Sequence, residues 1–223
     1  VCVAEDHSAP AEPSNAIAAV DIDGAGHRTL VEGNDFYANP RLNPDGSCLA
    51  YLTWNHPNMP WEGCELHVAI LDAAGTVASD QLVAGGPSES ILQPEWSPDG
   101  ILHFVSDASG WWNIYRWESG VRQALCPMEA EFGQPLWILG ASTYGFVTAD
   151  RMLCCYSQAG IDHLAWIAAS DLRLIPIELP CTSIDMVRCS PDMAVYIGAA
   201  PDGPSAIYSL ATGHKPQTTL PGV

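Results

Sequence analysis

The feature that most constrains the fold is an alternation of tight turns and short apolar strands, clearest in QPEWSPDGILHFVSDASGWWNIYRW, from Gln93 to Trp117. Pro98-Asp99-Gly100 is a turn tripeptide, because proline presets the first turn torsion, aspartate bonds its own backbone and glycine accepts a positive φ. The next residues, 101–106, place apolar side chains on both faces of an extended chain, which predicts a strand buried on both sides. A second turn cluster, 107–110, and the aromatic and β-branched run 112–117 complete a unit of strand, turn, strand, turn and strand.

Three other segments repeat this pattern: NPRLNPDGSCLAYLTW at 39–54, QPLWILGASTYGFVTAD at 134–150 and IDMVRCSPDMAVYIGAA at 184–200. Pro44, Pro98 and Pro191 occupy equivalent turn positions, and each copy continues into a third strand and a short fourth one. A period of roughly 40 to 50 residues with four short strands per unit is typical of a β-propeller blade. A helical fold is excluded, because 19 glycines and 18 prolines interrupt every potential helix. The sequence therefore predicts an all-β propeller.

The predicted organisation is a single partial propeller over residues 1–223, with blades at approximately 1–37, 38–92, 93–133, 134–183 and 184–223. Residues 2–7, 16–22 and 28–32 match the second, third and fourth strands of a blade, and no first strand precedes them. KPQTTLPGV, at the other end, is interpreted as the fourth strand of the last blade. Four full four-stranded blades plus a partial N-terminal blade predict a fragment of a larger, seven- or eight-bladed ring. A small closed ring is the alternative, since propellers close with about 4 to 8 blades.

Charge and cysteine content narrow the possible partners. Eight Lys and Arg against 26 Asp and Glu give a net charge of −18, which repels phosphate backbones and anionic lipids, so we expect no nucleic acid or membrane partner. No apolar run approaches the roughly 20 residues of a spanning helix, and we expect a soluble, cytoplasmic protein. The eight cysteines lack C-x-x-C pairs and zinc-finger spacing, so we expect small buried thiols and neither a metal site nor a cofactor. The even number of cysteines leaves disulfides open.

The repeats, of the form SPDG…L.FVSD..G..N.Y, resemble those shared by TolB-type proteins and the prolyl oligopeptidase family of serine peptidases. Three segments sharpen the resemblance: the insertion LTWNHPNMPWEGCELHVA from Leu52 to Ala69, GNDFYANPRLNPDG before it, and EAEFGQPLW from Glu129 to Trp137. They look like the propeller of the bacterial dipeptidyl aminopeptidase and acylaminoacyl-peptidase branch of that family. The resemblance covers most of residues 1–160 and becomes the generic repeat after that.

The resemblance implies a two-domain serine hydrolase, in which a propeller precedes an α/β-hydrolase domain that carries a Ser, Asp, His triad. No G-x-S-x-G nucleophile elbow occurs in this sequence, because GASTY and GPSES each lack the final glycine. No catalytic residue can therefore be assigned here. The resemblance predicts a substrate-gating and substrate-positioning propeller, inert by itself, whose partners are the C-terminal α/β-hydrolase domain of the same parent and short peptide substrates.

Two groups of residues are candidates for contact with a peptide. The first lies in the aromatic, proline-containing loop after a second strand, a good place for a substrate-contacting lip; it comprises Trp54, His56, Asn58, Met59 and Trp61. The alternative is a loop that folds onto its own propeller or onto the hydrolase. The second group is Glu129 and Glu131, whose carboxylates could meet a substrate amino group, as acidic residues of related aminopeptidase propellers do. The alternative there is a solvated turn.

Other conspicuous residues are interpreted as structural. Trp111 and Trp112 suit blade packing, since paired strand aromatics stabilise sheets. His103 on a buried strand fits a hydrogen-bonded core histidine, and Asp45, Asp99 and Asp192 fit turns.

Two functions other than that of a peptidase propeller are compatible with the repeat. A free-standing TolB-like propeller that binds a protein or ligand is the alternative of a different class. A propeller glycosidase or lactonase is disfavoured, because the first-strand sequences YANPRLN, QPEWS and QPLWI offer no recurring set of carboxylates.

Overall fold

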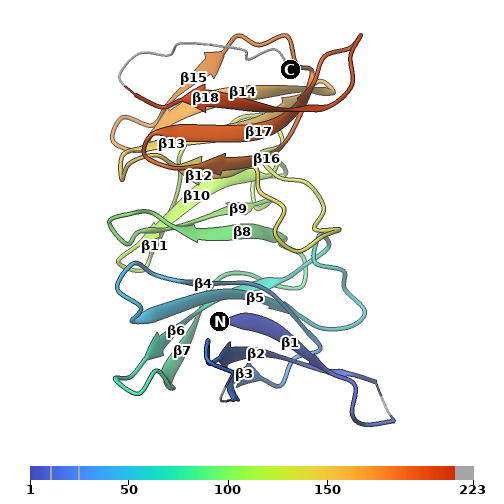
Figure 1. Cartoon of the computed structure of the whole chain (residues 1–223), viewed down its shortest axis with the longest axis vertical. Coiled ribbons are helices and arrows are strands. Elements are labelled where there is room, and N and C mark those ends of the chain that lie inside the picture. Colours follow the sequence, from blue (N-terminus) through green and yellow to red (C-terminus); the bar gives the residue numbers. More distant parts are fainter. Residues whose placement is uncertain (11, 25, 214–223) are drawn as a thin grey trace.

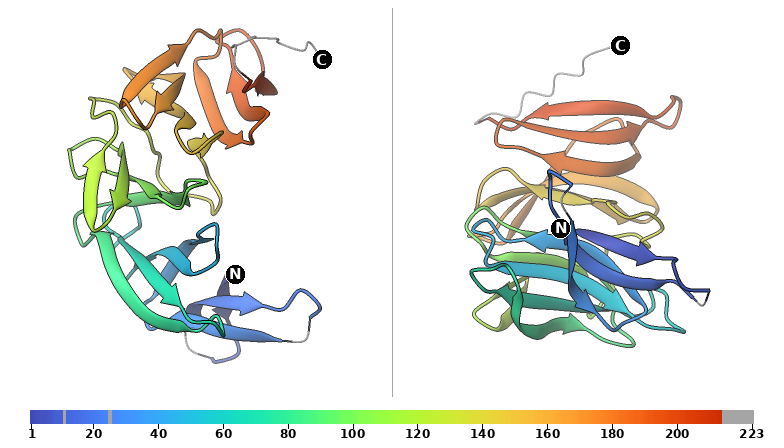
Figure 2. Two further views of the ribbon diagram at one scale, coloured as in Figure 1. Left: turned by 90° about the vertical axis from the view of Figure 1, so that its left-hand side faces the viewer. Right: turned by 60° about the horizontal axis from the view of Figure 1, so that its bottom comes forward.

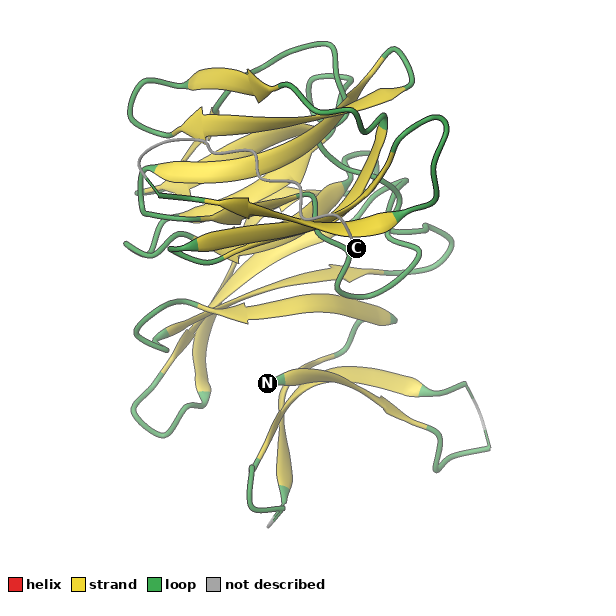
Figure 3. Ribbon diagram, turned by 45° about the horizontal axis from the view of Figure 1, so that its top comes forward, coloured by secondary structure: helices red, strands yellow, loops and turns green. Residues whose placement is uncertain are grey.

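The computed structural model describes residues 1–10, 12–24 and 26–213. All regular structure in these residues is strand, joined by turns and loops, as Figure 3 shows by colour. The described residues form no helix with the length and hydropathy needed to cross a membrane. The prediction of an all-β chain is confirmed.

The strands form five antiparallel sheets, each of which follows the order of the chain. The first sheet contains β1 (Cys2–Asp6), β2 (Ser14–Val20) and β3 (His27–Glu32). The second contains β4 (Phe36–Leu42), β5 (Cys48–Trp54), β6 (Glu65–Leu71) and β7 (Val77–Gly85). The third contains β8 (Ile91–Trp96), β9 (Leu102–Ser106), β10 (Asn113–Glu118) and β11 (Val121–Ala124). The fourth contains β12 (Tyr144–Phe146), β13 (Arg151–Gln158), β14 (Ile161–Ala168) and β15 (Arg173–Ile177). The fifth contains β16 (Ser183–Cys189), β17 (Met193–Ala199) and β18 (Ala206–Ala211).

The five sheets stack face to face along the molecule (Figure 1). Seen from the side, they follow an arc in which the first and fifth sheets lie at opposite ends and do not meet (Figure 2). This is the arrangement of propeller blades, so the predicted propeller is confirmed. The number of blades in a ring stays a prediction. The predicted last strand, KPQTTLPGV, lies outside the described residues.

Apolar side chains from adjacent sheets interdigitate and form one core layer at each junction. Between the second and third sheets, Leu52 and Leu66 pack against Phe104. Between the third and fourth, Val105 and Ile114 belong to the same buried cluster as Tyr144, Met152 and Tyr156. The remaining two junctions are built in the same way, around Ile17 with Tyr51 and around Leu153 with Tyr196. Burying a side chain of this size stabilises the fold by about 1.5 to 3 kcal/mol, so the stacking of sheets is the main source of stability.

The stretch from Gln93 to Trp117 forms β8, β9 and β10, as predicted. All five residues of β9 are buried, because one face of the strand packs on the second sheet and the other on the fourth. The turn at Pro98-Asp99-Gly100 has Gly100 at φ 84°, and the backbone N–H of Gly100 donates to the carbonyl of Ser97.

The innermost strands of three sheets share a β-bulge with one residue at positive φ. The register shifts between Ala38 and Arg41 in β4, between Leu92 and Glu95 in β8, and between Asp185 and Arg188 in β16. The residues with positive φ inside these bulges are Asn39 at 49°, Gln93 at 44° and Met186 at 56°. A bulge of this kind bends the strand and redirects a side chain, so the repeat sets the direction of the Asn39 and Gln93 amides on the inner wall.

One predicted strand is wrong. QPLWI, at 134–138, was expected to be the first strand of the fourth sheet, and it lies in a loop instead. The inner position is taken by β12, whose Tyr144 hydroxyl donates to the carbonyl of Gln93 at 2.7 Å. The side chains of residues 137–139 are exposed, and this apolar run pairs with no strand of the described residues.

All eight cysteines are free. Cys154 and Cys155 lie in β13 and are buried, and burial raises the pKa of both thiols. Cys64 is buried at the end of the loop before β6, and burial raises its pKa to about 12. These thiols are packed in their neutral form, as the sequence suggested for strand cysteines.

His103 is buried between the third and fourth sheets and is only 1% exposed. Its Nδ1–H donates to the carbonyl of Ile101 at 3.0 Å, while Nε2 has no partner among the described residues and the ring lies edge-on to Phe146. Burial lowers the pKa of His103 to about 4. The histidine is therefore a neutral core residue that is only partly hydrogen-bonded.

Because the folded protein holds His103 neutral, the unfolded chain binds a proton that the native state rejects as the pH falls below about 6.5. The histidine term is constant above that pH and destabilises the fold progressively toward pH 4. We predict that the unfolding free energy of the unsubstituted protein falls by about 2 kcal/mol more than that of a His103→Gln variant between about pH 7.5 and pH 5. Urea unfolding at both pH values measures this difference, and parallel curves for the two proteins would contradict it.

Candidate functional site

The loop 55–64 joins β5 to β6 and is held against its own sheet. Trp54, at the start of the loop, stacks on Phe36 with ring centroids 5.4 Å apart and is partly buried. His56 follows; its backbone N–H donates to Asp35 Oδ2 at 2.9 Å, and its ring Nδ1 lies 3.1 Å from the same oxygen. The hydrogen bond from the His56 backbone lowers the pKa of Asp35. Trp54 and His56 therefore fasten the loop to β4, and His56 stays exposed.

The second half of the loop is also anchored. Asn58 donates its amide to the carbonyl of Pro87 at 2.9 Å, and the buried Ser90 hydroxyl donates to the carbonyl of Pro60 at 2.9 Å. The carboxylate of Glu62 accepts the backbone N–H of Met59 at 2.8 Å, which closes a tight turn. Met59 projects outward with 46% of its surface exposed. Asn58 is thus a support, and Met59 is available for contact.

Trp61 meets a residue that the sequence did not single out. Its ring centroid lies 4.3 Å from that of Trp137, in the loop that precedes β12, and the two rings are tilted by 45°. Trp137, Ile138 and Leu139 are 73%, 56% and 62% exposed. Three consecutive apolar residues before Gly140 predict a strand, so the sequence signal at this surface points to the core and not to an exposed loop. We call Met59, Trp61, Trp137, Ile138 and Leu139 the aromatic lip.

The two glutamates occupy different settings. Glu131 Oε2 accepts the backbone N–H of Trp112 at 2.9 Å, so this carboxylate supports the β9–β10 turn. Glu129 is exposed, and its carbonyl accepts the amide of Gln158 at 3.2 Å. Within the described residues, no hydrogen bond joins either carboxylate to the aromatic lip. The structure therefore brings Trp61 together with Trp137, and leaves the two glutamates on a separate turn.

Beside the lip, a network of side-chain amides crosses the inner wall between the third and fourth sheets. Gln93 Nε2 donates to the carbonyl of Tyr144 at 2.7 Å and to the Ser142 hydroxyl at 3.0 Å, and Gln93 Oε1 accepts the backbone N–H of Thr143 at 2.7 Å. Gln93 is 5% exposed. One side chain thus holds the end of the 134–141 loop in place.

A cavity of about 20 Å³ lies next to this network. It is lined by Asn39, Gln93, Gln134, Leu136 and neighbouring residues of the 134–143 segment. Asn39 is 5% exposed, and its side chain makes no hydrogen bond with any residue in the described ranges. The volume admits one small polar group and not a whole residue.

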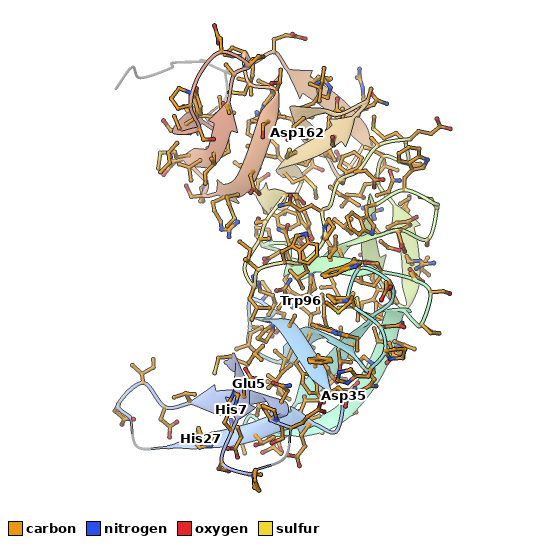
Figure 4. The ribbon with its side chains drawn as sticks, turned by 90° about the vertical axis from the view of Figure 1, so that its right-hand side faces the viewer. Glu5, His7, His27, Asp35, Trp96 and Asp162 are labelled. Atoms are coloured by element: carbon orange, nitrogen blue, oxygen red, sulfur yellow. The ribbon has the colours of Figure 1, made fainter. Side chains whose placement is uncertain are left out.

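A larger hollow of about 1080 Å³ lies over the first sheet and carries several carboxylates, among them Glu5, Glu32 and Asp35. Figure 4 shows Glu5, His7, His27 and Asp35 in this region, with Trp96 at the middle of the arc and Asp162 toward its other end. Ala4, Ala16 and Ala18 line it and alternate with Val3 and Ile17, which face the second sheet. The opposite face of each later sheet packs on the sheet before it, so this hollow has the position of a packing face in the repeat. The described residues contain no group of three or more His, Cys, Asp or Glu that could hold a metal ion.

Several solved structures are similar to this chain. A puromycin-hydrolysing peptidase from Mycobacterium tuberculosis is 34% identical over 100% of the chain, with a TM-score of 0.88. A puromycin hydrolase is 32% identical over 95% of the chain, with a TM-score of 0.89. The propeller formed by this chain is of the prolyl oligopeptidase type. This chain spans 37% and 34% of the length of those two proteins.

More distant structures share only the fold of this prolyl oligopeptidase-type propeller. Prolyl oligopeptidase B from Galerina marginata is 10% identical over 93% of the chain and has a TM-score of 0.70; the chain covers 29% of it. A putative TolB from Agrobacterium tumefaciens is 14% identical over 91% of the chain, with a TM-score of 0.62 and 79% of that protein covered. No protein-family model and no curated protein matches the sequence.

The contribution of the Gln93 hydrogen bonds to stability can be measured by substitution. Replacing Gln93 with alanine leaves the N–H of Thr143 without its side-chain partner and removes one of the two side-chain donors to the carbonyl of Tyr144, the other being the Ser142 hydroxyl. We predict that Gln93→Ala lowers the free energy of unfolding by roughly 2 to 3 kcal/mol. Gln81→Ala, the same substitution on the exposed strand β7, should change it by less than about 0.5 kcal/mol. Equal effects of the two substitutions in urea unfolding would contradict the assignment.

Proposed function

We propose that this chain is the propeller of a serine peptidase of the dipeptidyl or acylaminoacyl type, and that it admits and positions short peptides for a catalytic domain. One observation carries the proposal: identity of 32% and 34% to two puromycin-hydrolysing enzymes, each about three times as long as this chain. The partner proposed for the propeller is an α/β-hydrolase domain of the same parent protein. The sequence carries no G-x-S-x-G elbow, so the proposal assigns this chain no catalytic residue.

Steric exclusion is the physical basis of the proposed gate. Sheets stacked through close-packed cores form a stiff wall, and folded proteins cannot pass the openings of such a wall, whereas short peptides can. Closure of a propeller over a catalytic domain also removes water from the reaction. The net charge of −18 weakly favours neutral and cationic peptides over anionic ones, an effect that salt screens beyond about 10 Å.

The residues proposed for peptide contact are those of the loop after β5 together with the two glutamates. Exposure supports Met59 and His56 as contacting side chains, and Trp61 is partly exposed. Trp54 and Asn58 would act through the loop that they anchor. Glu129 retains a free carboxylate in the described residues, whereas Glu131 would act through Trp112.

We also propose a cytoplasmic location. Eight free thiols suit a reducing compartment, because paired cysteines are typical of oxidising ones.

The full-length protein should hydrolyse chromogenic aminoacyl or acylaminoacyl peptides, or puromycin, and a serine-directed phosphonate should abolish the reaction. The 223-residue chain assayed beside it should show no turnover, because it lacks a nucleophile elbow. Hydrolysis is followed by release of the chromophore, and the labelled serine is located by mass spectrometry. A full-length protein that cleaves none of these compounds and takes up no phosphonate would contradict the proposal and favour a TolB-like binding propeller.

A further inference from the structure

The aromatic lip is an exposed apolar surface made by two loops that are distant in sequence. The centroids of the Trp61 and Trp137 rings lie 4.3 Å apart, and Met59, Ile138 and Leu139, which are close to them in the sequence, are exposed. Large apolar side chains that stay exposed to solvent are typical of ligand-binding surfaces. Aromatic rings can pack on an aromatic or aliphatic side chain of a ligand.

Both loops are fixed before any ligand binds. Asn58 and Ser90 hold the first loop through the carbonyls of Pro87 and Pro60. Gln134 donates to Asp185 Oδ1 at 3.0 Å, and the Arg188 guanidinium donates to the carbonyl of Gly140, so both ends of the second loop are tied to β16. A surface that is already ordered loses little conformational entropy on binding, which favours affinity for a small ligand.

The cavity beside the lip holds a polar group without a partner. Asn39 is only 5% exposed and lines the cavity. Its side chain makes no hydrogen bond within the described residues. Gln134 and Leu136 line the same cavity and directly precede Trp137 in the chain. The Asn39 amide is not among the fully enclosed polar atoms of the described residues, so it stays open to a hydrogen bond from outside, and a ligand amide offers the matching donor and acceptor.

The charges around the lip restrict the ligand further. Glu62 follows Trp61, and Asp185 accepts a hydrogen bond from Gln134. Two nearby cations are already engaged: Arg188 donates to the carbonyl of Gly140, and Arg41 pairs with Glu95. A ligand carboxylate would therefore meet negative charge and no free base. The residues around the aromatic lip and the cavity therefore suit a ligand with an uncharged backbone amide and an apolar side chain.

We propose that the lip and the cavity form one peptide subsite, in which Trp61 and Trp137 bind an aromatic or aliphatic side chain and Asn39 hydrogen-bonds the adjoining peptide amide. This inference deepens the proposed function and rests on it for the identity of the ligand as a peptide. Asn39 and Trp137 are specificity-determining residues in this assignment, and neither is placed in the chemistry.

The first test measures binding of two tripeptide amides, Ala-Phe-Ala and Ala-Ala-Ala, to the full-length protein by calorimetry. If a phosphonate identifies a reactive serine, that serine is replaced by alanine; otherwise the unsubstituted protein serves. Trp137→Ser and Ile138→Ser should weaken binding of the Phe peptide roughly tenfold and change that of the Ala peptide less than about twofold. Ile175→Ser is the matched control, since Ile175 is 54% exposed on β15, close to the 56% of Ile138, and it should change neither affinity.

The second test isolates the Asn39 hydrogen bond. Asn39→Gly removes the amide and tolerates the positive φ of 49°, and it should weaken both peptides by roughly two- to tenfold. A series of Ala-Phe-Ala amides, each methylated at a different backbone nitrogen, is then compared with the unmethylated peptide. One methylated peptide should bind the unsubstituted protein more weakly than the unmethylated peptide does. The same two peptides should bind the Asn39→Gly variant with equal affinity. That non-additivity identifies the partner of Asn39.

Two outcomes overturn the subsite. One is an equal effect, or no effect, of Trp137→Ser on the Phe and Ala peptides; the other is unchanged affinity in Asn39→Gly. These outcomes are distinct from failure of the proposed function, because binding is measured without turnover. A protein that binds peptides through these residues and cleaves none would keep the subsite and lose the peptidase, whereas cleavage with unchanged affinities would do the reverse.

Discussion

Face-to-face packing of successive sheets is the interaction on which the rest of the structure depends. Each junction combines aliphatic or small side chains of one sheet with an aromatic side chain of the next, as Leu52 does with Phe104 and Leu153 with Tyr196. A sheet of three or four short strands cannot bury two apolar faces by itself, so each sheet depends on its neighbours. The arc in Figure 2 results from this dependence, and it places the innermost strands along one concave wall.

The inner wall carries the features that matter for function because the repeat interrupts its own strands there. A bulge with positive φ recurs in β4, β8 and β16, and it directs Asn39 and Gln93 toward neighbouring chain segments. Gln93 finds partners in the segment before β12 and fixes that segment. Asn39, at the same place in the sheet before, finds none in the described residues, and the unfilled amide lies next to the loop of Trp137. Structural and ligand-binding roles thus come from equivalent positions of one repeat.

The repeat and the strands could be predicted from the sequence, because turn tripeptides and short runs of apolar residues are local signals. Pro98-Asp99-Gly100 and the doubly apolar run of β9 are examples, and both lie where they were expected. The peptidase type of the propeller was predicted from the resemblance to the prolyl oligopeptidase family. The loop 134–141 could not be predicted from the sequence. Trp137, Ile138 and Leu139 have the composition of a buried strand, and only the tertiary structure leaves them exposed. The meeting of Trp61 with Trp137 was missed for the same reason: two loops with no local relation are joined by the stacking of sheets. The sequence contained a weak signal for the role of Asn39: Asn39-Pro40 in β4 and Gln93-Pro94 in β8 are similar dipeptides at equivalent positions. By themselves these dipeptides predict only strand residues.

The claim that the propeller positions peptides through its aromatic lip can be tested by photo-crosslinking. A short peptide amide with a benzophenone side chain in place of its aromatic residue would be irradiated with the full-length protein, and the adducts would be located by mass spectrometry. The account predicts adducts within 59–62 and 134–139, and their loss when an excess of the unmodified peptide competes. Adducts confined to the outer strands β7, β11 and β15, or adducts that competition leaves unchanged, would contradict it.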